Sequence, residues 1–306
     1  MKTAPEPSRK LGYFSLFFDL ARSYQSLLSL SQPLLGAIIA LGAMPSLRVI
    51  ILGLIAATTG YLAVFSMNDL LDYKVDSKSI KAGKAERDKH DIGVAVFKHP
   101  LARGELSFVA ALSWVLGTGF VSAFFAYLLN PLCAWIFLGC VVLETLYCAM
   151  RSVSWVKTFA TGVMVGLGGL AGWAAVAPLS RGSLYFFLFL ALWEVAGRNL
   201  ANDLADVDSD RRIGLKTVAS VFGNRTSATM ILIGAWLTVA SSVVLPISLT
   251  AKLVGLAITV WSMGTPSIKL ALNPSSMQAS SYFNKASLFP MLVLVAFLPF
   301  AFTNSL

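Results

Sequence analysis

The sequence is built largely from apolar stretches that are about as long as a bilayer is thick. The hydrocarbon core of a membrane is about 30 Å across and needs about 20 mostly apolar residues in each spanning helix. Nine such stretches follow one another along the 306 residues of the chain. We therefore expect an all-α integral membrane protein with about nine transmembrane helices in a single bundle. The expected spans are residues 26–44, 49–68, 106–128, 131–150, 156–178, 184–205, 227–247, 251–272 and 285–303.

The composition excludes the main soluble classes of protein. Hydrophobic residues make up 57% of the chain and charged residues 13%, whereas soluble domains have about 45–50% and about 25%. So apolar a chain is neither disordered nor collagen-like. Its 3 cysteines are too few to staple 306 residues into a disulfide scaffold. Charges are costly in such a chain, so their positions are informative.

The basic residues predict how the bundle is oriented. When the nine spans are threaded in order, 20 of the 24 Lys and Arg residues fall on the side of the N-terminus. The positive-inside rule makes that side cytoplasmic, so we expect a multi-pass protein of a bacterial-type inner or plasma membrane. The net charge of +9 then describes one membrane face and not a nucleic-acid patch. Membrane lipids are expected partners, and nucleic acid is not.

We expect one membrane domain over residues 1–306, with three features outside the spans. Residues 11–24 carry apolar side chains at helical spacing, interrupted by Asp19 and Arg22, which predicts an interfacial amphipathic helix. Residues 69–105 form a charged cytoplasmic loop or lid, and residues 203–225 form a second cytoplasmic loop. In the fifth span, small residues at helical spacing predict close packing of helix backbones. These residues are Gly162, Gly166, Gly169 and Gly172.

The acidic residues are scarce and clustered. Seven of the 15 lie in two windows, residues 68–76 and 202–210. Both windows follow the pattern Asn-Asp-Leu-x-Asp-x-x-x-Asp, 134 residues apart, and both lie at the cytoplasmic end of an expected span. The match indicates an internal two-fold repeat in which each copy contributes one helix end to a shared site. The matched positions are Asn68, Asp69, Asp72 and Asp76 in the first window and Asn202, Asp203, Asp206 and Asp210 in the second.

The spacing within each window predicts a metal site. The Asn and two of the acids are four residues apart and share one face of a helix, where stacked carboxylates need a counter-charge. Mg²⁺ is bound by a few carboxylates and commonly bridges them to phosphates, so we expect Mg²⁺ with a diphosphate between the windows. A competing interpretation is that the windows are solvated helix ends. Nearby basic residues suited to phosphate oxygens are Arg103, Lys157, Arg212 and Lys216.

Charged residues inside the sixth span suggest a second part of the site. Glu194, Arg198 and Asn202 recur every four residues, and an ionisable group within a membrane indicates a functional site by default. These three residues are candidates for binding an acceptor or for supporting the residues that do. Glu194 and Arg198 can also neutralise each other, so a purely structural ion pair is an equal alternative.

These motifs resemble those of the UbiA superfamily of intramembrane aromatic prenyltransferases, and the resemblance covers most of the chain. The first window is similar to the family's Asn-Asp-x-x-Asp-x-x-x-Asp motif. Residues 206–217 read Asp-Val-Asp-Ser-Asp-Arg-Arg-Ile-Gly-Leu-Lys-Thr and resemble its second motif with a Gly-x-Lys-Thr/Ser tail. Residues 100–104 read Pro-Leu-Ala-Arg-Gly and are similar to its Arg-Pro-Leu-x-x-Gly loop.

The resemblance implies an Mg²⁺-dependent prenyltransferase. Such an enzyme moves an isoprenyl group from its diphosphate to an acceptor, often aromatic, as in quinone or related lipid biosynthesis. The diphosphate ionises and leaves an allylic cation, which the acceptor attacks. The acids that the resemblance implies to be catalytic are Asp72, Asp76, Asp206 and Asp210, and it implies a metal held by these four together with Asn68, Asp69 and Asp203.

The sequence departs from the family pattern in two regions. About two dozen residues separate Asp76 from Pro100, and this insert, residues 77–98, is dense in charge and is expected to form a longer lid. At residue 99 the family's Arg is replaced by His99. In the first span, Gln32 precedes Pro33 where many relatives have Arg. The sequence leaves the acceptor and the isoprenyl chain length open.

Two other classes of membrane protein use acidic clusters and stay as alternatives. A transporter built from inverted repeats would carry polar groups through to the opposite membrane face, whereas both windows lie on one face. A membrane CDP-alcohol phosphotransferase would carry an Asp-Gly-x-x-Ala-Arg signature, which neither window contains.

Overall fold

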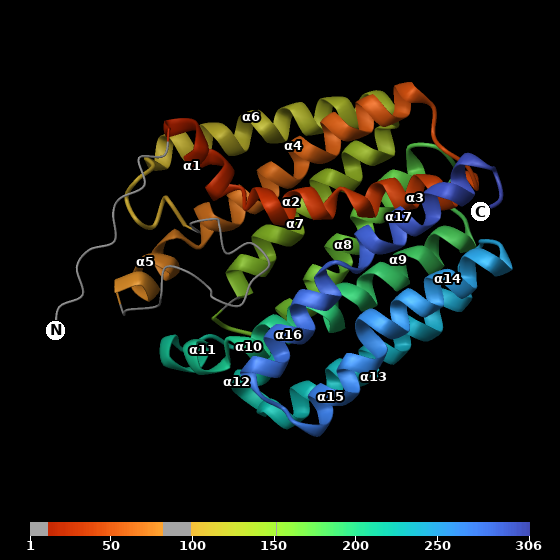
Figure 1. Cartoon of the computed structure of the whole chain (residues 1–306). Helices are drawn as coiled ribbons and strands as arrows, with labels where there is room; N and C mark the ends of the chain where they lie inside the picture. The colour runs from red at the N-terminus through yellow and green to blue at the C-terminus, as the bar shows by residue number, and fades with distance from the viewer. Residues whose placement is uncertain (1–11, 82–98, 151) are drawn as a thin grey trace.

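The structure is a computed structural model that describes residues 12–81, 99–150 and 152–306 (Figure 1). Over these ranges all regular structure is helical and no strand is present, which confirms the predicted all-α class. The predicted lid over residues 69–105 has its central part, residues 82–98, outside the described ranges. Most of the insert at residues 77–98 also lies outside the described ranges, as does residue 11, the first residue of the predicted interfacial helix.

The helices follow one another with short connections, and two short π-helices interrupt the second half of the chain. The first half contains α1 (Tyr13–Leu20), α2 (Ser23–Ser29), α3 (Ser31–Leu41), α4 (Leu47–Leu71), α5 (Tyr73–Lys81), α6 (Phe108–Leu129), α7 (Pro131–Met150) and α8 (Lys157–Ala174). The second half contains α9 (Arg181–Trp193), η1 (Glu194–Asn199), α10 (Leu200–Ala205), α11 (Val207–Ile213), α12 (Val218–Phe222), α13 (Asn224–Val243), α14 (Leu249–Thr259), η2 (Val260–Gly264), α15 (Thr265–Leu272), α16 (Ser276–Ser287) and α17 (Phe289–Phe302).

In the described part of the chain, 8 helical stretches are long and apolar enough to cross a membrane. They correspond to eight of the nine predicted spans, although the last starts at Ser276 and not at residue 285. The remaining predicted span, residues 156–178, is helix α8, which packs against α3, α7 and α9. Its glycines and Lys157 make it less apolar than the other stretches. The expected nine spans are therefore eight apolar stretches and one glycine-rich helix of the bundle.

Serine residues cap the starts of several long helices. The side chains of Ser46, Ser107 and Ser248 accept hydrogen bonds from backbone amides in the first turns of α4, α6 and α14. Ser180 and Ser183 cap the start of α9 reciprocally. These bonds satisfy amide groups that have no partner within the helix.

The glycines of α8 allow it to approach two neighbouring helices closely. A Cβ atom on Gly172 would overlap the backbone of Pro33 in α3, and one on Gly169 would overlap the Leu190 side chain in α9. Similar overlaps would arise at the other two positions singled out by their spacing, Gly162 and Gly166. The predicted close packing of this helix is confirmed.

Helix α1 forms within the segment predicted to be an interfacial helix. It packs on α4 and α6, and the Phe17 ring lies 4.9 Å from the Trp114 ring, measured between centroids. Leu20 is fully buried, whereas Phe14 and Phe18 are exposed. One apolar face of α1 therefore covers the protein, and a second apolar face points outward.

A cluster of buried aromatic side chains fixes the position of α9 and of η1, which follows it. The Trp193 indole donates a hydrogen bond to the carbonyl of Ala286 at 2.9 Å. The rings of Phe189 and Phe289 pack edge to face, with their centroids 5.5 Å apart. This cluster joins α9 to α16 and α17.

The two acidic windows lie at the same end of the bundle. Helices α5 and α11 both lie at this end, opposite the α3–α4 connection and the C-terminus (Figure 1). We call it the motif end and define it by residues 68–76 and 202–210. Helix α4 leads into the first window and α10 leads into the second.

Candidate functional site

The two acidic windows share the same backbone hydrogen bonds. In the first window, the Asp72 amide donates to the Asn68 carbonyl and the Asp76 amide donates to the Asp72 carbonyl, each at 2.9 Å. The corresponding bonds of the second window are 3.0 and 2.9 Å long and join Asp206 to Asn202 and Asp210 to Asp206. In each window, successive backbone hydrogen bonds therefore join the three residues that are spaced four apart.

Each window also contains a break in the helix at its central acid. Asp72 stands between α4 and α5 with φ −85° and ψ 0°. Asp206 stands between α10 and α11 with φ −97° and ψ 7°. The windows therefore match in local backbone geometry as well as in sequence.

Most of the acids in the windows are withdrawn from solvent. Asp206 is half-buried and Asp208 is exposed, whereas five others are buried, each at most 5% exposed. These five are Asp69, Asp72, Asp76, Asp203 and Asp210. The interpretation of the windows as solvated helix ends does not fit them, because a buried carboxylate requires cations or hydrogen-bond donors around it.

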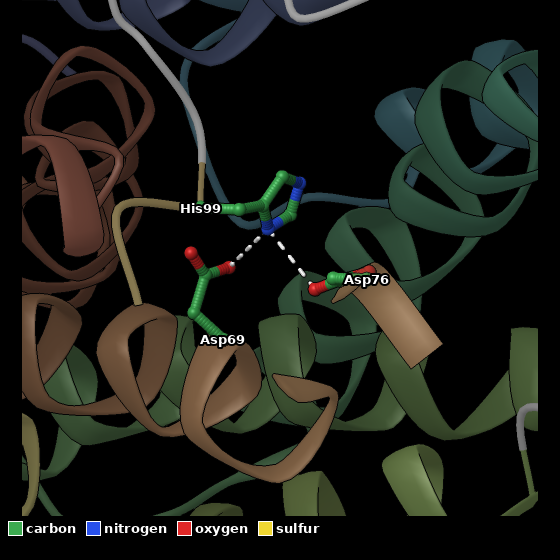
Figure 2. Close-up of side chains that lie close together, drawn as sticks. All are labelled: Asp69, Asp76 and His99. Atoms are coloured by element: carbon green, nitrogen blue, oxygen red, sulfur yellow. Dashed lines mark ion pairs between the residues drawn. The ribbon is translucent and has the colours of Figure 1, made fainter. Parts of the chain in front are cut away.

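His99 supplies a cation to the first window. Figure 2 shows its ring directed between Asp69 and Asp76, with Nδ1 3.3 Å from Asp69 Oδ1 and 3.0 Å from Asp76 Oδ2. Burial opposes protonation of the imidazole, but the two carboxylates outweigh this effect and raise the pKa of His99 above its usual range. The ligand atoms of these three residues all lie within 4.8 Å of one another.

Arg22 supplies a second cation and connects the first window to the N-terminal helices. It stands between α1 and α2 with a left-handed φ of 45°. Its Nη2 atom donates to Asp69 Oδ1 at 2.8 Å and to Asn68 Oδ1 at 3.0 Å. On its other side, Asn68 Nδ2 donates to Glu144 Oε1 in α7 at 2.7 Å. The amide of Asn68 is thus held between a guanidinium and a carboxylate.

In the second window, Asp203 is held by the start of α8. Lys157 Nζ lies 3.7 Å from Asp203 Oδ1, and the Thr158 hydroxyl donates to Asp203 Oδ2 at 3.5 Å. Lys157 is only 3% exposed, and its ammonium lies 5.0 Å from the centroid of the Tyr147 ring. Each window therefore has cations from elements distant in the sequence.

A cavity of about 580 Å³ opens between the windows and reaches into the bundle. At the motif end its wall includes Asn68 from the first window and Asn202 and Asp206 from the second. Beyond that end most of its wall is apolar. Its size falls within the range of about 300–1,000 Å³ that is typical of ligand sites.

The charged pair predicted in the sixth span is formed and lies on the cavity wall. Arg198 Nη1 donates to Glu194 Oε2 at 3.2 Å, and both residues line the cavity. The guanidinium also lies over the rings of Trp193 and Phe283, 5.7 and 6.0 Å from their centroids. Its Nε atom is buried and has no hydrogen-bond partner in the described part of the chain. The predicted ion pair is therefore formed, and it also lies on the wall of the cavity.

The basic residues predicted to bind diphosphate do not line this cavity. Lys157 is buried beside the second window, and Arg103 pairs with Glu105 at 2.8 Å. Arg212 and Lys216 are exposed in the connections that follow the second window. Among the described residues, the basic side chains that line the cavity are instead Arg22, His99 and Arg198.

Sequence reasoning missed the roles of three residues near the first window. In the sequence, Arg22 interrupts the apolar pattern of the expected interfacial helix and adds to the basic side, whereas Glu144 lies in the fourth expected span without a charged partner nearby. For His99 a signal was present, since it occupies the place of a basic residue in the related loop. Arg22 and Glu144 gave no such signal, because Arg22 and Asp69 are 47 residues apart and Asn68 and Glu144 are 76 residues apart.

The donor atoms at the motif end suit a hard divalent cation. The two windows offer carboxylate oxygens, and Mg²⁺ prefers oxygen ligands. Asp69 Oδ2 is buried and accepts no hydrogen bond within the described part of the chain, so it retains a free ligand atom. The residues present therefore fit the magnesium that the sequence predicts.

Comparison with known proteins places these features in one family. Residues 29–301 match the model of the UbiA prenyltransferase family. Digeranylgeranylglyceryl phosphate synthase of Thermococcus kodakarensis is 29% identical over 233 residues, covering 75% of this chain and 76% of that protein. The 4-hydroxybenzoate octaprenyltransferase of Shewanella woodyi is 25% identical over 221 residues, covering 70% of each.

Solved structures show the same fold. A UbiA homologue from Aeropyrum pernix superposes with a TM-score of 0.74 at 17% identity, covering 90% of this chain and 98% of that one. A UbiA homologue from Archaeoglobus fulgidus, bound to DMAPP and Mg²⁺, superposes with a TM-score of 0.68 at 19% identity, covering 92% and 99%. These likenesses concern the arrangement of the helices.

Proposed function

Because the chain belongs to the UbiA prenyltransferase family, we propose that it transfers an isoprenyl group from its diphosphate to an acceptor within the cavity, with Mg²⁺ at the motif end. One observation carries this proposal. A single cavity has residues of both acidic windows at one end and an apolar interior beyond them. This arrangement fits a substrate that has an anionic head and a hydrocarbon tail.

The acids of both windows are the proposed metal ligands. Bound Mg²⁺ supplies positive charge to the diphosphate oxygens as the leaving group departs. Arg22 and His99 keep the buried carboxylates of the first window in place through ion pairs, and Lys157 does so for the second. The proposed ligands are Asp72, Asp76, Asp206 and Asp210, supported by Asn68, Asp69 and Asp203.

The basic residues on the cavity wall are suited to hold the diphosphate. Arg22 and His99 line the cavity at the motif end, where negative charge grows on the diphosphate when the C–O bond breaks. Positive groups already fixed in position stabilise this charge without reorganising. Lys157, Arg103, Arg212 and Lys216 lie outside the cavity wall, so their proposed part is indirect: they add positive charge near the motif end, which favours an anionic ligand.

Apolar and aromatic residues protect the allylic cation. Tyr61, Phe65 and Tyr147 line the cavity near the motif end, and aromatic faces attract cations. The apolar wall limits access of water, which would otherwise capture the cation.

The wall formed by η1 and α10 is the proposed acceptor site. Arg198 presents a guanidinium that suits a carboxylate or phosphate on the acceptor, and Glu194 lies beside it to receive a proton. Asn202 continues this wall toward the second window. Aromatic acids and glyceryl phosphate lipids, the acceptors implied by the names of the relatives, both carry such an acidic group. The proposed pathway is accordingly quinone or related lipid biosynthesis.

Chain orientation follows from the distribution of charge. Most basic residues of the sequence belong to the side of the motif end, so we place this end in the cytoplasm by the positive-inside rule. The membrane would then be a bacterial-type inner or plasma membrane, with the diphosphate end of the donor reaching the site from the cytoplasmic side.

Replacement of single acids by their amides tests the proposed function. Asp72→Asn and Asp206→Asn keep the side-chain size but remove a charge, so each is expected to lower isoprenyl transfer by about 100-fold or more. Asp208→Asn is the matched control, because Asp208 belongs to the second window but is exposed. Activity is measured by mass spectrometry of products from isoprenyl diphosphates, Mg²⁺ and a panel of hydroxybenzoate, dihydroxynaphthoate, homogentisate, porphyrin and glyceryl phosphate acceptors. Full activity of Asp72→Asn or of Asp206→Asn would exclude the proposed metal site.

The alternatives weighed from the sequence do not describe this family. A transporter with cytoplasmic acidic sites and a membrane CDP-alcohol phosphotransferase both differ in reaction from a prenyltransferase, to whose family model residues 29–301 belong. Product formation in detergent, without a sealed compartment, is a direct test against transport.

A further inference from the structure

The cavity extends along almost the whole length of α4. On this helix its wall runs from Asn68 at the motif end to Val49 near the other end. With a rise of 1.5 Å per residue, the 19 steps between these residues span about 28 Å. The far end of the cavity is formed by residues from four separate segments, Pro45, Leu129, Cys133 and Ala175.

The wall contributed by α4 is one continuous apolar face. Its residues recur at the three- and four-residue spacing of a single helix face. Beyond the motif end they are small or aliphatic apart from Tyr61 and Phe65, and so they offer no anchor for a polar ligand. The small and aliphatic residues of this face include Val49, Gly53, Ala56, Ala57, Gly60 and Val64.

The length of this face can be compared with that of an isoprenyl tail. One isoprene unit adds four C–C bonds of about 1.5 Å, which extend a zigzag chain by about 5 Å. Two units therefore reach about 10 Å from the diphosphate and four units reach about 20 Å. Gly53 lies 15 steps before Asn68 on α4, or about 22 Å along the helix axis.

Gly53 is the position at which the α4 face leaves space for such a tail. A Cβ atom on Gly53 would meet nothing within 4 Å, although the residue lines the cavity. Gly60, on the same face, differs because a Cβ there would lie 2.7 Å from the Ser122 hydroxyl oxygen. The absence of a side chain at residue 53 is therefore not required by packing between helices.

We infer that the donor carries a tail of about four isoprene units or more, that this tail lies along α4, and that Gly53 determines the chain length accepted. The inference rests on the proposed function, since it assumes that the diphosphate binds at the motif end. The occupant of the far half of the cavity is then the substrate itself, because this space is continuous with the charged end where the diphosphate binds.

Binding of unreactive donors tests the inference without any acceptor. The probes are the thiolodiphosphate analogues of geranyl and geranylgeranyl diphosphate, which have two and four isoprene units, each with Mg²⁺. Wild-type protein is expected to bind the four-unit probe tighter by on the order of tenfold or more. In Gly53→Phe this preference should disappear, while affinity for the two-unit probe changes by less than about threefold. Gly53→Leu should give an intermediate preference.

Gly117→Phe is the matched control. Gly117 is exposed on α6 and lies outside the cavity, and a Cβ there would also meet nothing within 4 Å. This variant should keep the wild-type preference for the four-unit probe. Thermal unfolding of each protein without ligand shows whether the variant is folded, and Gly53→Leu serves if Gly53→Phe is not.

Two results would overturn the inference. Equal affinity of the wild type for both probes would mean that the far half of the cavity holds something else, such as a membrane lipid. An unchanged preference in folded Gly53→Phe would mean that the tail ends before residue 53 or leaves the cavity before it, so that Gly53 does not determine chain length. Failure of the proposed function is a separate result, namely absence of product from the wild type with every isoprenyl diphosphate.

Discussion

Asn68 illustrates how a motif residue can be held in place by charges that the motif does not contain. Its side-chain oxygen Oδ1 accepts a hydrogen bond from Arg22, and its side-chain nitrogen Nδ2 donates one to Glu144. Only a side chain with both a donor and an acceptor satisfies these two partners. An aspartate at this position would place a second carboxylate against Glu144. The first window is therefore joined through Asn68 to the N-terminal helices and to α7.

Replacement of His99 tests its part as a counter-charge. His99→Ala would leave the Asp69 and Asp76 carboxylates with one fewer cation, and the loss of one partner from a buried ionic group is costly. We expect the KM for isoprenyl diphosphate to rise about tenfold or more. His99→Arg, which restores the basic residue of related loops, should stay close to the wild type. Equal KM values for His99→Ala and the wild type would show that residue 99 needs no charge.

Replacement of Arg198 separates an acceptor site from a structural ion pair. Arg198→Gln should raise the KM for an acidic acceptor about 10- to 100-fold, because a charge-assisted hydrogen bond is lost. Affinity for the donor thiolodiphosphate should stay within about threefold of the wild-type value, since Arg198 lies outside both acidic windows. The amide of the same acceptor, which lacks the acidic group, is the control and should be affected much less. A structural ion pair would instead weaken donor and acceptor together.

At the scale of elements, apolar length predicted the helices well. Residues 131–150 were expected as one span and form helix α7 with the same ends. Apolar length alone did not predict the interior breaks at η1 and η2, because it indicates where a span begins and ends and not how its interior is wound. The break at Leu30 between α2 and α3 has a signal in the sequence, because Pro33 lacks a backbone N–H and its ring clashes with the carbonyl four residues earlier.

The glycines of α8 give a prediction at this scale. Gly172→Ala would place a methyl group against the backbone of Pro33, which cannot move away as the end of a side chain can. Overpacking of this kind costs about 1–3 kcal/mol, so the midpoint of thermal unfolding in detergent should fall measurably. Gly139→Ala on α7 is the control, because a Cβ there would meet nothing within 4 Å. A Gly172→Ala variant as stable as this control would contradict the close packing of α3 and α8.

At the scale of the whole molecule, the sequence predicted a site shared by the two windows but not the cavity between them. Two matched windows at the same end of the bundle already predicted that their acids would converge. The ion pairs around them were not predictable, because Arg22 and Lys157 reach the windows from distant elements. The same was true of the burial of the acids, which depends on how the helices pack. A pattern within one helix cannot report a contact between helices.

The orientation of the whole molecule can be tested with single cysteines. In a variant without the three native cysteines, Lys216→Cys places a thiol on the motif end and Arg181→Cys places one at the start of α9. A maleimide that does not cross membranes should label residue 181 in intact cells and residue 216 only after permeabilisation. The opposite pattern would place the motif end outside the cytoplasm.

The number of residues per turn in the π-helix η1 determines the direction in which the side chains of the second window point. Successive residues of an α-helix are rotated by about 100°, and a π turn accommodates one residue more than an α turn. Before η1, Trp193 is anchored on Ala286, and after it Asp203 is anchored on Lys157. If the same residues of Glu194–Asn199 wound as an ordinary α-helix, Asp206 would be rotated by about 100° relative to Trp193 with every motif residue intact. A chain can therefore keep the complete motif and still lack the site.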